Sequence, residues 1–398
     1  MKRGERIAVV GRGLWGAAAA RHLARLGADR GVEVLLIGPD EPMGDWTAHQ
    51  GVFASHYDEG RITRRLADET LWSRLSTAAI ERYAEIEADS GLRFFGDVGA
   101  AMVGPSPRDP DDFMARVARV AESEKIPADR LEGGAIAERL PFFDVPPDSA
   151  LFHEPNGAGH ISPRRLVRAQ TVAAAALGVQ VMAETVTRIR DAGAGVEIET
   201  PGGLLAADRA LVATGGFSVS PDLGTGPLDL RVFARTVAFF RIDGAEAERL
   251  AGMPSVIHKR ADLDWYLLPP IRYPDGETYL KIGGDPDDIH LETVAEMRDW
   301  FRSGGRQAVG EHLSDHIRRF IPGLAVRATH IAPCVTTWTA HGRPYVGWGE
   351  SPRIGVLTGG NGAGAKCSDE LGRLGATLIL EGAVDDPAYP EGFDVAFR

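Results

Sequence analysis

Hydrophobic positions near the start of the chain form two short uninterrupted runs separated by an alanine-rich segment. The first run, residues 7–10, is apolar enough for a strand buried on both faces. It leads directly into Gly11-Arg12-Gly13-Leu14-Trp15-Gly16, after which the alanine-rich segment and the second run, residues 32–37, follow. This order predicts a strand, a turn, a helix and a second strand.

Helical patterns are spread unevenly over the rest of the chain. Apolar spacing predicts helices at 62–88, at 111–122 and, with a break at Gly304-Gly305, at 291–320. Another helix is predicted after the loop 157–163, with Ser162 as its N-cap and Pro163 in its first position. The last predicted helix opens at Lys366 and runs to about residue 381.

Strand patterns fill much of the remaining chain. Residues 93–104 are typical of a hairpin, and apolar runs predict strands at 184–190, 194–198, 208–213, 237–240, 265–268 and 279–282. Because helices and strands do not alternate regularly, we predict a nucleotide-binding α/β domain interrupted by a second domain.

The glycines of the first turn indicate dinucleotide binding. In the pattern GxGxxG, Gly11 permits the tight turn, Gly13 lets the backbone approach a pyrophosphate, and Gly16 lets the helix pack on the strand. The free N–H groups of the helix N-terminus then face the phosphates. The alternative is a glycine-rich turn with a purely structural role.

An acidic residue that would hold the adenosine ribose is not at its expected place. Gly38 follows the second predicted strand, and the nearest carboxylates are those of Asp40 and Glu41. Asp40 either reaches the ribose from a longer turn or is an ordinary solvated loop acid.

Composition and charge narrow the range of partners. The chain has 398 residues, of which 44% are hydrophobic, so two domains with sizeable cores are expected. A formal net charge of -12 disfavours nucleic acid or an anionic membrane as the main partner, because both attract contiguous basic surfaces. A local basic pocket for a small anion stays compatible with this balance.

Two cysteines, Cys334 and Cys367, provide no disulfide framework, so the reducing cytoplasm is the expected compartment. The basic start at residues 1–6 resembles a signal peptide, but the glycines and Arg12 break the apolar run that follows. No stretch approaches the roughly 20 apolar residues that span a bilayer, so we expect a soluble protein. His312 and His316 lack the glutamate of a zinc-protease helix; we expect surface histidines and no metal site.

Four segments together resemble the D-amino-acid oxidase superfamily of FAD-dependent oxidoreductases, most closely the branch of monomeric sarcosine oxidase and N-methyltryptophan oxidase. They are the first glycine turn, the loop 157–163 followed by Leu166, the turn Ala213-Thr214-Gly215, and the glycine-rich segment 359–366. The resemblance covers essentially the whole chain. It implies a Rossmann-like FAD-binding domain (1–85, 150–220 and 326–398) and an inserted substrate domain (86–149 and 221–325), built on a mainly antiparallel sheet with helices, in an α+β fold overall.

The resemblance also implies a reaction. Hydride leaves the carbon beside an amine for the flavin, and molecular oxygen takes the electrons, giving an imine and hydrogen peroxide. The expected substrate is a small amine or amino acid, and the expected assembly is a monomer or a small homo-oligomer.

Two cationic residues are implied to hold the substrate carboxylate. In the family's Arg-x-x-Arg motif, here Arg61 to Arg64, Arg61 lies near the flavin and Arg64 clamps the carboxylate, which a guanidinium can hold by two parallel hydrogen bonds. By the same resemblance Lys366 completes the clamp. Without it, the two arginines and Arg65 would be read as a solvated helix face.

Three further residues carry implied roles. Lys281, inside an apolar strand pattern, corresponds to a lysine that stabilises negative charge as oxygen reacts with reduced flavin. Cys334 corresponds to a cysteine that carries the flavin through a thioether, and Tyr266 to a pocket tyrosine, whereas Cys367 is expected to be structural. The full set expected to bind the cofactor is Gly11, Gly13, Leu14, Trp15, Gly16, Asp40, Arg61, Val186, Thr214, Gly215, Cys334, Gly359, Gly362, Gly364 and Lys366.

Some positions depart from the family pattern. Asp285 stands in place of a pocket histidine, and Thr336 in place of a second pocket tyrosine. A roomier and differently charged pocket is therefore expected, suited to a bulkier or more basic amino acid than sarcosine. His56 and Tyr57 replace paired histidines, and His341 contacts either the cofactor or solvent.

Two other functions fit the same patterns. The first is a flavin dehydrogenase that passes electrons to a quinone or a carrier. The second is a noncatalytic flavin-binding subunit of a larger oxidoreductase. An NAD-dependent dehydrogenase shares the first glycine turn but leaves the segment 359–366 unexplained.

Overall fold

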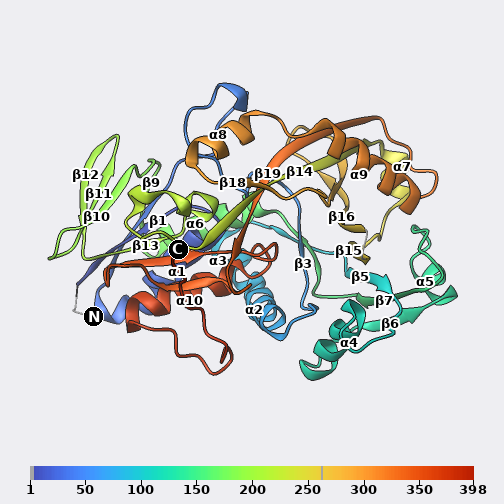
Figure 1. Ribbon diagram of the computed structural model, residues 1–398, viewed down its shortest axis with the longest axis horizontal. Helices are drawn as coiled ribbons and strands as arrows, with labels where there is room; N and C mark the ends of the chain where they lie inside the picture. Colours follow the sequence, from blue (N-terminus) through green and yellow to red (C-terminus); the bar gives the residue numbers. More distant parts are fainter. Residues whose placement is uncertain (1–3, 261–262) are drawn as a thin grey trace.

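A six-stranded sheet forms the core of one half of the molecule (Figure 1). The computed structural model describes residues 4–260 and 263–398, so the first three residues of the basic start lie outside the described part. In spatial order the strands are β20 (Tyr345–Trp348), β21 (Ile354–Thr358), β13 (Arg209–Val212), β1 (Arg6–Val10), β2 (Glu33–Ile37) and β9 (Gln180–Met182). Neighbouring strands are parallel except β20 and β21.

Alternate residues of β1 pack into two different hydrophobic clusters, which explains why its sequence is apolar on both faces. Ile7 and Val9 pack with residues of helices α1 (Leu14–Leu26), α6 (Pro163–Ala176) and α10 (Ser368–Glu381). Ala8 and Val10 instead pack against a three-stranded sheet. That sheet comprises β10 (Arg188–Asp191), β11 (Val196–Thr200) and β12 (Gly203–Ala207). The predicted strand, turn, helix and strand are confirmed.

A buried charged network joins the helices behind this sheet. Asp369, at the start of α10, accepts hydrogen bonds from Arg21 Nη2 at 2.9 Å and from Gln170 Nε2 at 2.7 Å. Its side chain is fully buried and also pairs with Arg82. Buried charges need partners of this kind, and the network fixes the start of α10, where Asp369 stands three residues after Lys366.

A nine-stranded sheet forms the other half of the molecule. In spatial order its strands are β18 (Ile289–Leu291), β14 (Leu230–Ile242), β17 (Thr278–Gly283), β16 (Leu263–Arg272), β15 (Ser255–Arg260), β5 (Ala100–Pro105), β7 (Ser149–Glu154) and β6 (Asp129–Glu132), and β19 (Ala328–Thr339) also pairs with β14. All pairs are antiparallel except β15 and β5. The mixed α/β class and the mainly antiparallel second sheet are confirmed.

Helices cover this second sheet. α9 (Gln307–Phe320) and α5 (Gly134–Arg139) pack in one hydrophobic cluster with the sheet, and α4 (Phe113–Ser123) packs in another. The short α7 (Gly244–Arg249) follows β14, and α8 (Val294–Arg302) precedes α9. The predicted break between these last two helices is confirmed, since Gly304 and Gly305 both adopt positive φ.

A small sheet lies between the two halves. It is formed by β3 (Arg61–Thr63), β8 (Gly159–Ile161) and β4 (Phe95–Asp97), and the helices α2 (Thr70–Glu81) and α3 (Tyr83–Ser90) complete this region. Ser162 caps α6, because its Oγ accepts from the backbone N–H of Arg165 at 3.1 Å, and Pro163 is the first helical residue. Both predictions for this helix start are confirmed.

Three predicted elements are wrong. The single helix at 62–88 is instead β3 followed by α2 and α3, because β3 finds hydrogen-bond partners in β8 that local spacing does not reveal. The hairpin at 93–104 is two strands of different sheets: β4 pairs with β8, and β5 pairs with β7 and β15. The strand predicted at 184–190 begins only at Arg188, because residues 184–187 belong to the connection between β9 and β10.

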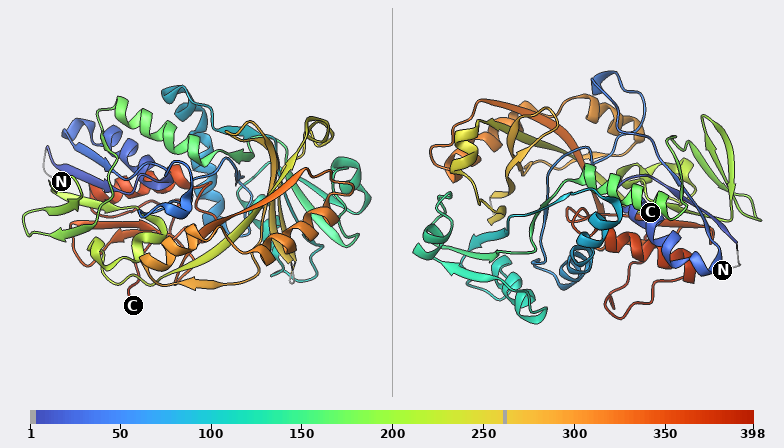
Figure 2. Two further views of the ribbon diagram at one scale, coloured as in Figure 1. Left: turned by 90° about the horizontal axis from the view of Figure 1, so that it is seen from above. Right: turned by 180° about the vertical axis from the view of Figure 1, so that it is seen from behind.

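The long strands β14 and β19 connect the two halves. They pair from Leu230 with Thr339 to Arg241 with Ala328, and Figure 2 shows them running side by side through the middle of the molecule. Both β7 and β19 belong to the nine-stranded sheet, although residues 150–220 and 326–398 were expected to belong to the nucleotide-binding domain. The assignment of segments to domains stays a prediction.

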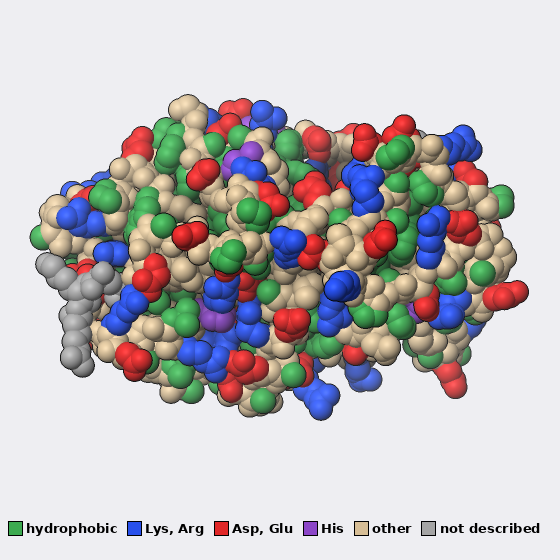
Figure 3. Space-filling view, turned by 90° about the horizontal axis from the view of Figure 1, so that it is seen from below, with side chains coloured by type: hydrophobic (Ala, Val, Ile, Leu, Met, Phe, Trp, Pro, Cys, Tyr) green, Lys and Arg blue, Asp and Glu red, His purple; other side chains and the backbone are tan. Residues whose placement is uncertain are grey.

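Charged side chains are interspersed on the face seen in Figure 3, where basic and acidic residues alternate over the whole width of the molecule. In the described residues no helix has both the length and the apolar character required to cross a membrane.

Candidate active site

One large cavity extends between the two halves of the molecule, with a volume of about 1840 Å³. Its walls come from the β1–α1 turn, the segment 52–57, strand β19 and the glycine-rich segment that precedes α10. The cavity continues toward α4 and β15 in the half that contains the nine-stranded sheet. A single space therefore joins the predicted nucleotide site to the predicted substrate side.

The first glycine turn is tight on one side and open on the other. A Cβ atom added to Gly11 would lie 2.3 Å from the carbonyl oxygen of Ala213, and one added to Gly16 would lie 1.8 Å from the carbonyl oxygen of Gly11. A Cβ on Gly13 would meet only His56 Nδ1, at 3.8 Å. Gly13 thus leaves its backbone accessible at the start of α1, which is the arrangement that a dinucleotide pyrophosphate requires.

The C-terminal glycine-rich segment closes over this turn. Trp15 Nε1 donates a hydrogen bond to the carbonyl oxygen of Gly364 at 2.8 Å. Asn361 holds the segment to β19, since its backbone N–H donates to Thr337 O at 2.8 Å and its Oδ1 accepts from Thr339 N at 3.0 Å. Leu14, Gly359 and Gly362 line the same cavity.

Other residues expected to bind the cofactor have different surroundings. Val186, Thr214 and Gly215 line the cavity, and a Cβ on Gly215 would meet no atom within 4 Å. Asp40 lies outside the cavity lining, with a side chain 75% exposed and paired with Arg12. The structure thus places the Asp40 carboxylate on the guanidinium of the first turn, and it is Arg12 that lines the cavity.

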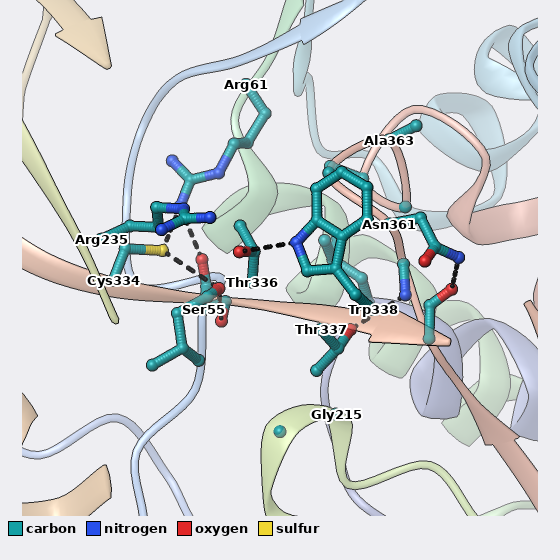
Figure 4. A pocket seen from close by; sticks show the side chains of 18 of the residues that line it. Ser55, Arg61, Gly215, Arg235, Cys334, Thr336, Thr337, Trp338, Asn361 and Ala363 are labelled. Carbon is teal, nitrogen blue, oxygen red and sulfur yellow. Dashed lines mark hydrogen bonds between the residues drawn. The ribbon is translucent and has the colours of Figure 1, made fainter. Parts of the chain in front are cut away.

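Arg61 links the cavity wall to Cys334. Its Nη2 donates to the carbonyl oxygen of Ser55 at 2.7 Å and lies 3.7 Å from Cys334 Sγ, and its Nη1 binds Asp58. Figure 4 shows the sulfur of Cys334, on β19, facing this guanidinium. Cys334 is a half-buried free thiol that lines the cavity.

Lys281 is buried, with 1% of its surface exposed, and does not line the cavity. Its Nζ binds the carboxylate of Asp58 and donates to the carbonyl oxygen of Gly60 at 2.9 Å. The Nζ atom also lies 5.6 Å from the ring centroid of Tyr266, which does line the cavity. The ammonium is therefore directly behind the cavity wall. Lys281 therefore does not lie on an exposed face of its strand.

Arg64 and Lys366 line the same cavity but differ in their partners. Lys366 is buried, and its Nζ donates to Trp72 O at 3.2 Å and Ser76 Oγ at 3.1 Å; burial lowers its pKa to about 8. The guanidinium of Arg64 has no hydrogen-bond or ion-pair partner within the described residues, and its Nε is shielded from solvent. Desolvation lowers the pKa of Arg64. The reading of Arg61 and Arg64 as a solvated helix face is wrong.

Tyr266 projects from β16 into the cavity, and burial raises its pKa to about 12. Its ring also fills the space over Gly283, where an added Cβ would lie 2.4 Å from the ring. The phenol is therefore neutral at physiological pH and can contribute a hydrogen bond or an apolar face.

The departures from the family pattern also have structural consequences. Asp285 lines the cavity, but its side chain is 1% exposed, pairs with Arg306 and accepts from Thr236 N at 2.9 Å. Arg306 compensates the negative charge of Asp285, so Asp285 no longer supports the expectation of a more basic substrate. Thr336 accepts a hydrogen bond from Trp338 Nε1 at 3.2 Å, and Trp338, which is 39% exposed, lines the cavity (Figure 4).

The histidines divide into three cases. His56 lines the cavity, and burial lowers its pKa to about 3, so it is neutral. His341 lies outside the large cavity and bonds the carbonyl oxygen of Asp394 at 2.8 Å. His312 and His316 are half-buried, with their Nε2 atoms 3.1 Å apart, and His312 lines the cavity. Within the described residues no cluster of three or more metal-binding side chains occurs.

Two residues of the site were missed by sequence reasoning. Asp58 binds both Arg61 and Lys281, and Trp338 forms part of the cavity wall. Asp58 stands three residues before Arg61, which hints at a local ion pair, but nothing in the sequence indicates its contact with Lys281. Trp338 stands at the end of an apolar strand pattern, where an aromatic residue is unremarkable.

Comparison with known proteins places this site in a family context. A family model described as FAD dependent oxidoreductase matches residues 6–378. The chain is 24% identical to N-methyl-L-tryptophan oxidase of Yersinia pestis (strain Pestoides F) over 380 residues, which are 94% of this chain and 95% of that protein.

Two solved structures have the same fold. One is NikD, an unusual amino acid oxidase essential for nikkomycin biosynthesis, with a TM-score of 0.75, 19% identity and 99% coverage of both chains. The other is L-proline dehydrogenase from P. horikoshii, with a TM-score of 0.71, 17% identity and coverage of 98% of this chain and 96% of that one.

Proposed function

Because the chain belongs to the DAO family of FAD-dependent oxidoreductases, we propose that it oxidises the carbon–nitrogen bond of an amine that also bears a carboxylate. FAD, when bound, would supply the acceptor for a hydride from the carbon beside the amine and the route of the electrons to oxygen. The products are an imine and hydrogen peroxide. The relative that oxidises N-methyl-L-tryptophan and the resemblance to NikD support an amino-acid substrate.

The observation that carries this proposal is the unpartnered guanidinium of Arg64. Its Nε is shielded from solvent, and a desolvated donor without a partner is costly, so the partner is expected to be a ligand. Arg64 reaches the cavity that also contains the open turn at Gly13. A carboxylate held by two parallel hydrogen bonds would satisfy the guanidinium and orient the substrate.

Lys366 supplies the second positive charge of the substrate site. Its present partners are neutral oxygens of α2, which compensate the ammonium less than a carboxylate would. Arg64 and Lys366 influence each other electrostatically, since the positive charge of Arg64 contributes to the lowered pKa of Lys366. Two cations in one pocket also favour the neutral form of the substrate amine, whose lone pair assists loss of hydride.

The walls of the substrate site suggest a bulky substrate. Thr336 and Ala363 are small, and the exposed ring of Trp338 provides an apolar surface beside them (Figure 4). Tyr266 provides a second aromatic wall from β16. We therefore favour an amino acid with a large apolar or aromatic side chain over a small one such as sarcosine.

The flavin would lie along the cavity from Gly13 to Cys334. The glycine turn and α1 would hold its pyrophosphate, and Trp15 and Gly364 would border it from the C-terminal segment. Cys334 would carry it covalently through Sγ, which is supported by the position of this half-buried free thiol in the cavity wall. Lys281 would stabilise negative charge as oxygen is reduced, acting from behind Tyr266.

Anaerobic mixing of the purified flavoprotein with a panel of amines and amino acids tests this proposal. A carboxylate-bearing amine should bleach the flavin absorbance, and its methyl ester should bleach it far more slowly. Admission of air should restore the colour and produce hydrogen peroxide. Turnover with a dye but not with air would identify a dehydrogenase, and absence of bleaching by any member of the panel would contradict an amine-oxidising function.

A further inference from the structure

The position of Lys281 is unusual for a lysine. Strand β17 pairs on both sides, so that Lys281 lies opposite Phe239 of β14 and Leu268 of β16, and only 1% of its surface is exposed. An ammonium at such a place requires a compensating negative charge. Burial lowers the pKa of Lys281, and the positive charge of Arg61 lowers it further.

Asp58 supplies that negative charge. Its side chain is 6% exposed, and its Oδ2 binds both Lys281 Nζ and Arg61 Nη1. Its Oδ1 accepts from the hydroxyl of Tyr273 at 2.9 Å and from the backbone N–H of Glu59 at 2.7 Å. Four donors thus converge on one carboxylate, which fixes its orientation.

The resulting chain of contacts leads from Lys281 to the cavity wall. Asp58 joins Lys281 to Arg61, and Arg61 lies 3.7 Å from Cys334 Sγ. Two cations and one anion leave a net positive charge beside the proposed flavin position. Without Asp58 the two cations would repel each other in a buried place, and the lysine, unlike the arginine, could release its proton.

We propose that Asp58 is a positioning residue for Lys281, whose ammonium it holds behind Tyr266 and couples to Arg61. The inference rests on the proposed function, in which that ammonium assists flavin reoxidation. Asp58 would then favour the ammonium form of Lys281, against the lowering of its pKa by burial and by Arg61.

The other ionisable groups around Lys281 do not replace Asp58. On β16 and directly after its end these are Tyr266 and Tyr273, whose pKa values are raised by burial, so both phenols are neutral at physiological pH. Arg61 of β3 contributes a positive charge near Lys281. The neighbouring ionisable group on β19 is the thiol of Cys334. Asp58 is the carboxylate in contact with Nζ among the described residues.

Lysine NMR of the holoenzyme tests the inference directly. The chain has only five lysines, at positions 2, 125, 259, 281 and 366, so selectively labelled lysine side chains give few signals, and Lys281→Met assigns the one of interest. In the wild type, Lys281 should be an ammonium at pH 7.5. In Asp58→Asn its titration midpoint should fall by about 1–3 pH units.

A matched control is available in the turn that connects β16 to β17. Asp275 accepts from the hydroxyl of Tyr279 at 2.8 Å but does not contact Lys281 or Arg61. Asp275→Asn should leave the Lys281 midpoint unchanged. In Asp58→Asn, but not in Asp275→Asn, reoxidation of photoreduced flavin by air should slow as pH rises through the new midpoint.

A neutral Lys281 in the wild type at pH 7.5 would overturn the inference, and this measurement needs no variant. An unchanged midpoint in folded Asp58→Asn would overturn it as well. If the midpoint falls while Lys281→Met reoxidises at the wild-type rate, the positioning role of Asp58 holds, and it is the proposed role of Lys281 in reoxidation that fails.

Discussion

The guanidinium of Arg61 lies against the sulfur of Cys334, with Nη2 3.7 Å from Sγ. This places a fixed cation beside the one cysteine that lines the cavity in the described chain, whereas Cys367 is fully buried. The two thiols therefore differ in access to a cofactor, and burial raises the pKa of Cys367 to about 11.

Cys334→Ala is expected to release the flavin on acid precipitation, leaving the yellow colour in the supernatant. The wild type and Cys367→Ala should keep the colour in the pellet, because only Cys334 offers its sulfur to the cavity. Absorbance of the two fractions measures the outcome. A wild-type pellet without flavin would rule out the covalent link.

Arg64→Gln is expected to raise the KM for the substrate about 10- to 100-fold, because a charge-assisted hydrogen bond is worth about 1.5–3 kcal/mol. The flavin spectrum should be retained. Arg65→Gln is the control, since Arg65 donates to the carbonyl oxygen of Gly157 at 3.1 Å and lies outside the cavity lining. Equal effects of the two variants would argue against a specific role for Arg64.

Lys366 makes carboxylate binding depend on pH. Because burial lowers its pKa to about 8, the ammonium is lost as pH rises through that value, and affinity for a competitive carboxylate inhibitor should weaken above it. Lys366→Met should bind weakly and show no such transition. Titrations of flavin absorbance with the inhibitor between pH 6 and about 10 measure this, and a wild-type affinity that is constant over the range would contradict a role for the ammonium.

The same group predicts how stability responds to pH in the absence of substrate. Unfolding exposes Lys366, whose pKa then returns to 10.5, so between pH 8 and 10.5 the unfolded chain binds more protons than the folded one. The free energy of unfolding of the wild type should therefore rise, relative to Lys366→Met, by on the order of 3 kcal/mol over this window. Urea unfolding at several pH values measures it, and a difference that falls with pH would have the wrong sign.

Two glycines of the first turn should respond differently to alanine. In Gly13→Ala the new Cβ meets only His56 Nδ1, at 3.8 Å, so the apoprotein should fold normally but bind FAD poorly. In Gly16→Ala the Cβ would lie 1.8 Å from Gly11 O, so folding itself should suffer. Thermal unfolding of the apoproteins and FAD titration separate the two effects, and normal FAD affinity of Gly13→Ala would contradict the proposed pyrophosphate position.

Local sequence patterns predicted the elements that are determined by residues close together in the chain. The strand at residues 7–10 is buried on both faces, and its uninterrupted run of apolar residues indicates this burial. The capped start of α6 was equally predictable, because Ser162 and Pro163 act within one helical turn. By contrast, β3 at residues 61–63 depends on pairing with β8 almost a hundred residues later, which no local spacing reveals.

The site shows the same division between local and long-range information. Glycine spacing indicates where a phosphate can approach, and the structure shows that Gly13 is the open position. The partners of charged residues were not predictable, because Asp58 meets Lys281 across 223 positions of sequence, and Asp285 is compensated by Arg306 on another element. Charge seen in a sequence is therefore a poor guide to the net charge of a pocket.

The hydrogen bond from Trp15 to Gly364 has a consequence for how the protein is made. The cofactor cavity is formed by the first turn of the chain together with a segment 349 positions later. The second edge of the central strand β1 is likewise covered only when β13 pairs with it. On a ribosome the early part of the chain would emerge with half of its nucleotide cradle absent. Loading with flavin would then follow release of the nearly complete polypeptide, and a product truncated before Gly364 would lack the wall that closes the cradle.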